Sequence, residues 1–333
     1  METQTQPQSP GPRPSWQYRR QGFSNLLRMG HCAPTVMQTL LDVSAMDREW
    51  LVRLSAGMPG GIGNTGFECG AVTSPLVMLG MRHGLREVDG GLPVLFDRGH
   101  ALCRDFLADH DTLQCREIRG KDRFPRHCIA PVLRSPERFM RTVDGDQPDA
   151  IPAATRVGYA RLYSHLVENS FHCAQAVLTR LGYTAADDRE LFDATSAFTG
   201  GTLFMGRTCS AFTAGVMVIG LGAGEIENSR LRVVRLLTRM TVGGDAFDDG
   251  INKFNPSMNR GYRLSKWFVG EFGSTQCQAI TGCDFSDPKG VSDYVEGGQV
   301  TRCRAIACQV AEKVQELLAQ LEATRPPPSG GGG

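Results

Sequence analysis

The chain contains one sequence unit twice, and this repetition constrains its fold more than any other feature. Cys32 is followed 37 residues later by Cys69, and Cys173 is followed 36 residues later by Cys209. Glycines recur at the same distances before the second cysteine of each copy: Gly60, Gly61, Gly66 and Gly200, Gly201, Gly206. We therefore expect two similar folded units and a chemistry built on the cysteines that both copies contain.

The 333 residues divide into two units that each fall within the usual size of one domain. Unit A is predicted over residues 21–141 and unit B over residues 154–323, with an insertion near 230–259 in unit B. The remaining segments are a disordered arm rich in Pro and Gln, a polar linker and a low-complexity tail: 1–20, 142–153 and 324–333.

Apolar residues recur at helical rather than strand spacing. Ala174, Val177, Leu178 and Leu181 form one such series, and alternating strand patterns are scarce. The predicted fold class is all-α, with about four to six helices per unit. We expect the two units to pack together as a pseudo-dimer within one chain. The small-residue stretches 69–80 and 209–222 are predicted to form that contact or a site wall.

Comparison of the two copies also pairs the later cysteines. Cys115 and Cys277 both follow a helical stretch that contains aromatic residues. Cys128 pairs with Cys303, for which Cys308 is the rival. The predicted ligand set is therefore four thiols in each unit: Cys32, Cys69, Cys115 and Cys128 in unit A, and Cys173, Cys209, Cys277 and Cys303 in unit B.

Three cysteines are absent from the shared set. Cys103 aligns with Ser265, while Cys283 and Cys308 lack a counterpart in unit A. We interpret Cys283 and Cys308 as packing or auxiliary thiols.

The segment before each second cysteine is a glycine-rich turn. A helix that begins near Cys69 or Cys209 would place the sulfur beside unpaired backbone N–H groups, which favours the thiolate. We predict that the six glycines allow backbone contacts to a cofactor: Gly60, Gly61, Gly66, Gly200, Gly201 and Gly206. The alternative is a tight turn beside an inert buried cysteine.

Several common site types are excluded by the motifs. The sequence has no Cys-x-x-Cys, which disfavours a zinc ribbon and a thioredoxin-type dithiol, and no Cys-x-x-Cys-His for covalent haem. The segment 219–224 does not match an NAD-binding loop. A net charge of +1 gives no reason to expect nucleic-acid binding, and we expect no membrane insertion. The predicted compartment is the cytoplasm, where clustered thiols more often serve metal binding or catalysis.

These features resemble the redox-active family named for the pattern C_GCAxxG_C_C, present here as a tandem duplication. The resemblance rests on Cys32-Ala33 and Cys173-Ala174, on 69–71 and 209–211, and on the two later cysteines of each unit. Ser210 replaces the first glycine of the motif in unit B, and Ser74 and Ala214 replace its last glycine. A similar cysteine module in the split-Soret cytochromes is associated with a non-haem iron–sulfur site, so the resemblance implies such a site without haem.

Three functions are compatible with this sequence. The first is electron transfer by one four-cysteine iron–sulfur cluster per unit, [2Fe–2S] or [4Fe–4S], with an unidentified redox partner protein. The second is thiol–disulfide exchange or sulfur relay, with Cys69 and Cys209 as nucleophiles of low pKa. The third is a zinc-stabilised or cofactor-free interaction domain.

Overall fold

The computed structural model describes residues 14–120, 126–145, 150–226, 228–241 and 255–324. Over these residues the fold is all-α apart from one short antiparallel hairpin in unit A. The elements of unit A are α1 Ser15–Met29, α2 Cys32–Ser44, α3 Glu49–Ser55, α4 Gly70–His83, β1 Val88–Asp89, β2 Leu92–Pro93, α5 Val94–His110, α6 Cys115–Arg119 and α7 Arg126–Asp144.

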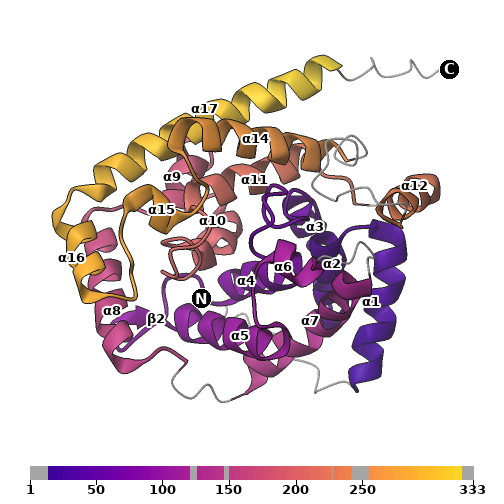
Figure 1. Ribbon diagram of the computed structural model, residues 1–333, viewed down its shortest axis with the longest axis horizontal. Coiled ribbons are helices and arrows are strands. Elements are labelled where there is room, and N and C mark those ends of the chain that lie inside the picture. The colour runs from indigo at the N-terminus through magenta and orange to yellow at the C-terminus, as the bar shows by residue number, and fades with distance from the viewer. Residues whose placement is uncertain (1–13, 121–125, 146–149, 227, 242–254, 325–333) are drawn as a thin grey trace, which may run out of the picture.

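Unit B repeats this order with additions (Figure 1). Its elements are α8 Ala153–Glu168, α9 Cys173–Arg180, α10 Arg189–Thr195, the 3₁₀ turn η1 Ser196–Phe198, α11 Ser210–Ala223, α12 Arg230–Thr241, α14 Pro256–Phe272, α15 Cys277–Thr281, α16 Pro288–Glu296 and α17 Gln299–Thr324. Within the described residues each unit exceeds the four to six helices expected, because short helices such as α6 and α15 are too brief to show periodicity.

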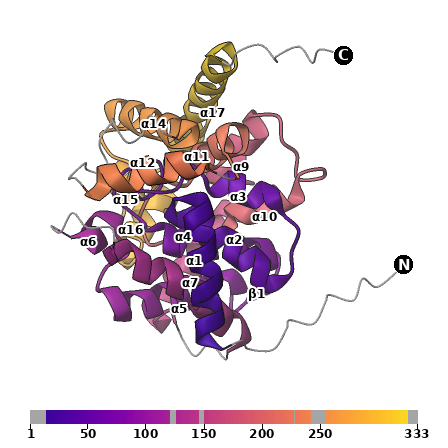
Figure 2. The same ribbon diagram turned by 90° about the vertical axis from the view of Figure 1, so that its right-hand side faces the viewer.

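Some predicted boundaries change. The predicted disordered arm covers residues 1–20, but helix α1 begins at Ser15, so the last six of those residues are helical. Part of the insertion near 230–259 forms α12, which crosses the end of α1, where the Asn228 side-chain amide donates to the Met29 carbonyl (Figure 2). Residues 1–13, 242–254 and 325–333 lie outside the described part of the chain.

Each unit packs one short helix against the other unit. Helix α3 of unit A packs on α11 of unit B, and α10 of unit B packs on α4 of unit A. A Cβ on Gly80 would lie 2.4 Å from the carbonyl oxygen of Asp193, and one on Gly220 would lie 2.6 Å from that of Leu54. These glycines recur in both copies because each lets a helix of the other unit approach its backbone. Such a self-complementary contact is typical of a two-fold dimer.

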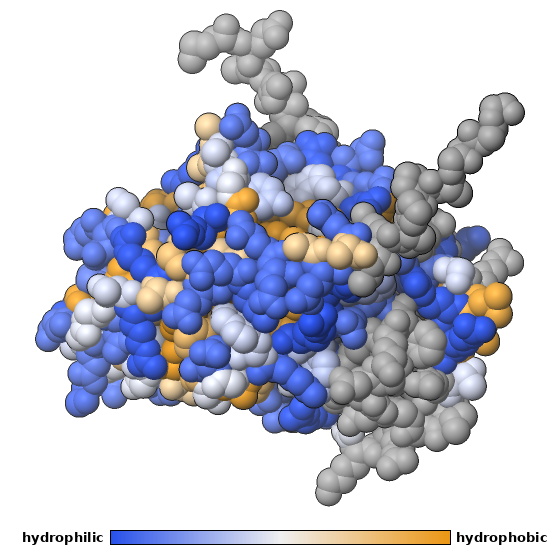
Figure 3. All heavy atoms as spheres, turned by 90° about the horizontal axis from the view of Figure 1, so that it is seen from above, coloured by the Kyte–Doolittle hydropathy of each residue, from blue (hydrophilic) through white to orange (hydrophobic). Residues whose placement is uncertain are grey.

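The core is shared between the units. Helices α4 and α11 are buried over almost their whole length, which explains why both are apolar on all sides rather than amphipathic. The face seen in Figure 3 is mostly hydrophilic, with small separate apolar areas. Among the described residues, none of the helices is both long and apolar enough to cross a membrane.

Candidate functional site

The two glycine-rich turns form one left-handed turn of backbone each. Five consecutive residues have positive φ in unit A, over 60–64, and five do so in unit B, over 200–204. Three of the unit B residues carry side chains, namely Thr202, Leu203 and Phe204. Since the left-handed conformation costs about 1–2 kcal/mol for a residue with a Cβ, both copies retain a strained backbone beside their cysteines.

The end of each turn positions the third cysteine. The Phe67 carbonyl accepts the backbone N–H of Cys115 at 2.6 Å, and the Arg207 carbonyl accepts that of Cys277 at the same distance. The six predicted cofactor-binding glycines all have positive φ. A Cβ on Gly201 would lie 2.6 Å from the Cβ of Cys277, so this glycine allows the turn to contact the cysteine. Cofactor contact by the six glycines stays a prediction.

Each turn also enters the other unit. A Cβ on Gly63 would lie 3.1 Å from the Gly261 carbonyl oxygen, and in the mirrored contact the Leu203 side chain lies against Gly99. His100 Nε2 is 2.9 Å from the Leu203 carbonyl oxygen. The two sites are thus supported from both halves of the chain.

The four predicted thiols of unit A lie close enough to act on one another electrostatically. Cys32 and Cys128 both raise the pKa of Cys69, and all three raise that of Cys115. Cys69 is the N-cap of α4, while Cys32 and Cys115 are the first residues of α2 and α6. Cys128 lies in the first turn of α7. Four helix starts therefore converge on one group of sulfurs.

Backbone N–H groups lie near these sulfurs. Burial raises the pKa of Cys32 and of Cys69, and the backbone of Gly60, Ala33 and Gly70 near Cys32 and of Ala71 near Cys69 partly offsets that rise. A Cβ on residue 70 would lie 2.7 Å from the Cys32 sulfur, so glycine is required for this approach. The arrangement is the one expected where helix starts stabilise negative charge on sulfur.

The four predicted thiols of unit B line one small cavity. This cavity of about 10 Å³ is lined by Cys173, Cys209, Cys277 and Cys303 together with residues of α11, α15 and α17. Such a volume holds roughly one water-sized sphere. Cys173 and Cys303 are joined by a hydrogen bond between their side chains, and the Tyr294 hydroxyl donates to the Cys303 sulfur at 3.8 Å.

The rival fourth cysteine lies elsewhere. Cys308 is exposed, whereas Cys303 is buried and faces the other three thiols. Within the part of the chain that the structure describes, no group of three or more His, Cys, Asp or Glu side chains is already placed to hold a single metal ion. The sulfurs are gathered but are not set around one ion position.

Burial opposes ionisation of these thiols. It raises the pKa of Cys69 well above the ordinary value, that of Cys209 to about 12 and that of Cys128 to about 11. Helices do begin at Cys69 and Cys209, but the expected low pKa is wrong because loss of solvent outweighs the N–H donors. Cys303 is different: hydrogen bonds from Cys173 and Tyr294 lower its pKa.

The histidines before the first cysteines cap helices or are buried. His172 accepts the backbone N–H of Gln175 at the start of α9 and lies 2.5 Å from the Thr199 hydroxyl. His31 occupies the equivalent N-cap position of α2 without a side-chain cap bond. Burial lowers the pKa of each to about 4, so both are neutral at pH 7.

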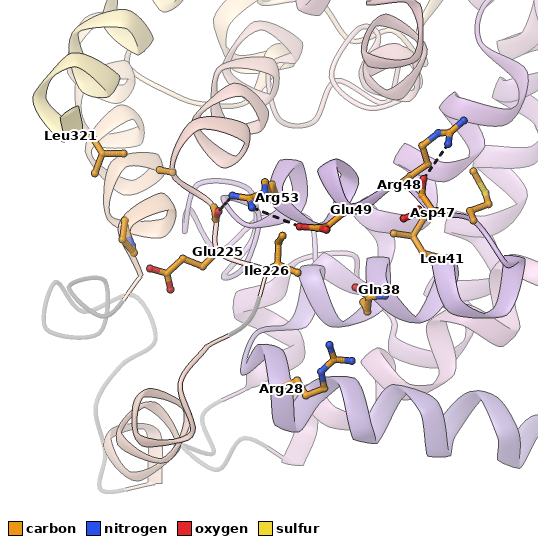
Figure 4. Close-up of a pocket in the computed structure, with 14 residues that line it drawn as sticks. Arg28, Gln38, Leu41, Asp47, Arg48, Glu49, Arg53, Glu225, Ile226 and Leu321 are labelled. Carbon is orange, nitrogen blue, oxygen red and sulfur yellow. Dashed lines mark hydrogen bonds and ion pairs between the residues drawn. The ribbon is translucent and has the colours of Figure 1, made fainter. Parts of the chain in front are cut away.

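A cavity larger than the one between the unit B thiols lies elsewhere. It has a volume of about 840 Å³ and lies at the outer junction of the units, where Arg53 pairs with Glu49 and donates to the Gly224 carbonyl (Figure 4). Its described lining is rich in charged side chains and contains no cysteine. The candidate site is therefore the pair of thiol groups, despite their small volume.

Four residues near the thiols were not singled out from the sequence. Arg119 and Arg138 make contributions that lower the pKa of thiols in unit A, and Tyr294 makes one that lowers the pKa of Cys303 in unit B. Glu68, buried at the contact between the units, precedes Cys69. Its copy in unit B is Thr208. Comparison of the two copies could have shown that this position differs, but not that the Glu68 side chain is buried.

The comparisons with known proteins agree with the duplicated pattern. The profile of the family described as "Putative redox-active protein (C_GCAxxG_C_C)" matches residues 30–139 and again residues 171–317. These two matches cover most of the chain, so the protein belongs to this family, as a tandem duplication. No curated protein and no solved structure matches the chain.

Proposed function

We propose that the protein is a redox-active electron-transfer protein in which each unit holds one iron–sulfur cluster on four cysteine thiolates. The observation that carries this proposal is the convergence of the four thiols shared by both copies. In unit B they line one cavity, although they come from segments up to 130 residues apart. Four cysteine sulfurs are the ligand set of [2Fe–2S] and [4Fe–4S] clusters.

The chemistry of the thiols and their burial are compatible with a bound cluster. When bound, such a cluster supplies reversible one-electron transfer. The protein's own contribution is to bury the ligands: Cys69, Cys115 and Cys209 are each at most 8% exposed. Backbone N–H groups at the starts of α2, α4 and α11 lie near the sulfurs and favour their negative charge.

Metal binding is compatible with the raised pKa values. In the metal-free protein, burial keeps the thiol protonated. The thiol loses this proton when a metal binds to the sulfur, so the raised pKa is a property of the metal-free site. The same burial argues against thiol–disulfide exchange through Cys69 or Cys209, since the attacking species is the thiolate. The proposal places the protein in the cytoplasm with a redox partner protein.

A structural zinc site in each unit is the second candidate. The small size of the unit B cavity favours it, because one ion with four thiolates needs less space than a cluster. This function would stabilise the fold without electron transfer.

The experiment is anaerobic purification followed by iron, zinc and acid-labile sulfide analysis. We expect iron and sulfide in equal amounts, with broad visible absorption that dithionite bleaches. Zinc without sulfide, in colourless protein, would contradict electron transfer and support the second candidate.

A further inference from the structure

Helix α1 of unit A presents its large apolar side chains to solvent. The side that faces the protein is formed by four buried residues: Tyr18, Gly22, Asn25 and Met29. On the opposite side three large apolar residues are each at least 50% exposed: Trp16, Phe23 and Leu27. Their spacing places these three side chains in one stripe along the helix. A surface helix of a soluble protein normally has the reverse arrangement, so the stripe indicates a surface that binds something.

Polar contacts fix this orientation of α1. The Asn25 side-chain amide donates to the Asp42 carboxylate at 2.9 Å, and the Gln21 amide donates to the same carboxylate at 2.6 Å. The Ser15 hydroxyl donates to Glu137 of α7 at 2.7 Å. The helix is thus held to unit A by polar groups, and its apolar stripe is left outside.

The corresponding helix of unit B has the ordinary pattern. Helix α8 precedes the first cysteine of its unit, as α1 does. At the position of the buried Asn25, α8 buries Leu166. At the positions of the last two apolar residues of the stripe, α8 exposes Ser164 and Glu168. The stripe is therefore a property of α1 alone and not a requirement of the shared fold.

Helix α12 extends the exposed apolar surface. It contacts α1 and crosses its end on the side that faces the viewer in Figure 2. Leu231 and Val234 of α12 are 70% and 59% exposed. Of the nine large apolar side chains that are exposed among the described residues, five therefore lie on these two helices. We call the surface formed by these five side chains the α1–α12 face.

The same two helices are strongly basic. Helix α1 contains three arginines and α12 contains four, and neither helix contains Asp or Glu. Arg19, Arg20 and Arg235 are exposed, while Arg232 pairs with Glu225. The whole chain, by contrast, has a net charge of only +1. Positive charge is thus concentrated beside the exposed apolar side chains.

We propose that the α1–α12 face binds an anionic lipid surface, with Trp16, Phe23 and Leu27 among the lipid headgroups and the arginines beside lipid phosphates. Helices with Trp, Phe and Leu on one side and basic residues beside them lie in the plane of such surfaces. Clusters of about four to eight basic residues on a helix are typical of anionic-lipid binding. The binding is peripheral and requires no helix that spans a membrane.

Two features favour lipid over a protein partner. The stripe lies on the outer side of one helix, which a fluid surface accepts as it is, whereas a protein must match it with a groove. The lack of acidic residues in both helices fits a surface of uniform negative charge, whereas a protein presents a fixed pattern of donors and acceptors. The same positive charge opposes pairing of this face with a second copy of itself.

This inference does not rest on the proposed function, because lipid binding needs neither a cluster nor zinc. The double variant Cys69→Ser/Cys209→Ser should bind lipid as the wild type does. Lipid binding without iron or zinc would refute the proposed function and leave this inference intact.

The test is sedimentation of the full chain with vesicles of phosphatidylcholine that contain about one-third phosphatidylglycerol, and with vesicles of phosphatidylcholine alone. Binding to the anionic vesicles should be at least about tenfold tighter and should weaken with added salt. The fluorescence of Trp16, measured as the difference between wild type and Trp16→Phe, should shift to shorter wavelength. The full chain includes the aspartates that follow α12 outside the described residues, so the measurement includes their effect: Asp245, Asp248 and Asp249.

Surface variants separate the apolar and the electrostatic contributions. Phe23→Ser/Leu27→Gln keeps the charge and should weaken binding at least about tenfold, because two apolar side chains no longer enter the headgroup region. Arg19→Gln/Arg20→Gln should weaken it to a similar extent and reduce the salt dependence. Helix α8 supplies the matched control: Val157→Ala/Val167→Ala removes side chains that are 71% and 58% exposed and should leave binding unchanged.

Three results would overturn the proposal. Equal binding to both kinds of vesicle would assign the face to a protein partner. Loss of binding in the arginine variant but not in the apolar variant would indicate charge attraction alone. A dimer in sedimentation velocity that Phe23→Ser/Leu27→Gln dissociates would assign the face to a second copy of the chain.

Discussion

The first cysteine of unit A and its copy in unit B have different neighbours. The backbone around Cys32, including Gly70, lowers the pKa that burial raises, whereas the principal influence on the pKa of Cys173 is the Cys303 side chain. The cause is one position of the motif: Gly70 gives the Cys32 sulfur access to the start of α4, and its copy Ser210 carries a side chain. The Ser210 hydroxyl bonds instead to the Phe198 carbonyl and the Gly201 N–H.

This difference shows that duplication preserved the positions of the thiols but not all of their polar partners: Ala71 and its copy Ala211 both act on the second cysteine, whereas the partners of the first cysteine differ. In unit A the backbone supplies donors to Cys32. In unit B the donors to Cys303 are side chains, Cys173 and Tyr294. Two sites with one ligand set can therefore differ in chemistry, and substitutions at the differing positions should reveal it.

The largest expected effect concerns what the two units share. Gly61→Ala or Gly201→Ala would place a Cβ at 2.5 or 2.6 Å from neighbouring atoms, in a backbone of positive φ. We expect a loss of about 3–5 kcal/mol in the free energy of unfolding in either unit. Gly270→Ala is the control, since a Cβ there meets nothing within 4 Å in a helix, and it should be neutral or stabilising. Thermal unfolding would measure all three variants. A mild effect in one unit alone would contradict the claim that the two turns have the same structural role.

Exchanging the motif residue should affect the units unequally. Gly70→Ser forces its Cβ against the Cys32 sulfur and the Ala33 backbone, which we expect to cost about 1–3 kcal/mol. Ser210→Gly removes two hydrogen bonds and gives back backbone freedom, for a loss of about 1–2 kcal/mol. Urea unfolding of the metal-free proteins would measure both losses. A loss below about 0.5 kcal/mol in Gly70→Ser would mean that glycine is not needed at this position for the approach of Cys32.

The fourth cysteines should differ in their response to pH. The pKa of Cys303 is lowered by its donors, whereas burial raises that of Cys128 to about 11. Because only the thiolate reacts, Cys303 should be alkylated at lower pH than Cys128, although Cys128 is more exposed. Tyr294→Phe removes one donor and should shift the Cys303 profile to higher pH, by about one unit or less. Mass spectrometry of iodoacetamide-treated, metal-free protein would record both profiles; coincident profiles would contradict the difference.

The smallest effects are expected for cysteines outside the shared set. Cys103 is 2% exposed, and unit B already has Ser265 in its place. Cys103→Ser should cost about 1 kcal/mol and leave metal content unchanged. Cys308→Ser, on the surface, should change stability by less than about 0.5 kcal/mol. Loss of metal in the Cys308→Ser protein would reopen the choice of the fourth ligand.

The sequence predicted the fold class and the grouping of the thiols because two copies allow one chain to be compared with itself. The paired cysteines, the glycine turns and the helix starts at Cys69 and Cys209 were all visible as repeated positions. Repetition says nothing about residues that differ, so Arg138, Tyr294 and Glu68 were missed.

The pKa direction could not be predicted either. Proximity to a helix start is readable in a sequence, whereas the burial that outweighs it depends on packing between distant segments. The packing of α3 and α10 against the other unit also depends on distant segments. The repeated glycines Gly80 and Gly220 were the visible sign of this close approach.

The most direct test counts iron and sulfide in three reconstituted variants beside the wild type. If each unit holds its own four-thiol cluster, Cys69→Ser and Cys209→Ser should each lose half of the iron and sulfide, and Cys103→Ser should lose none. The double variant Cys69→Ser/Cys209→Ser should be colourless. Full iron and sulfide in Cys69→Ser together with loss in Cys103→Ser would contradict the assignment of the sites.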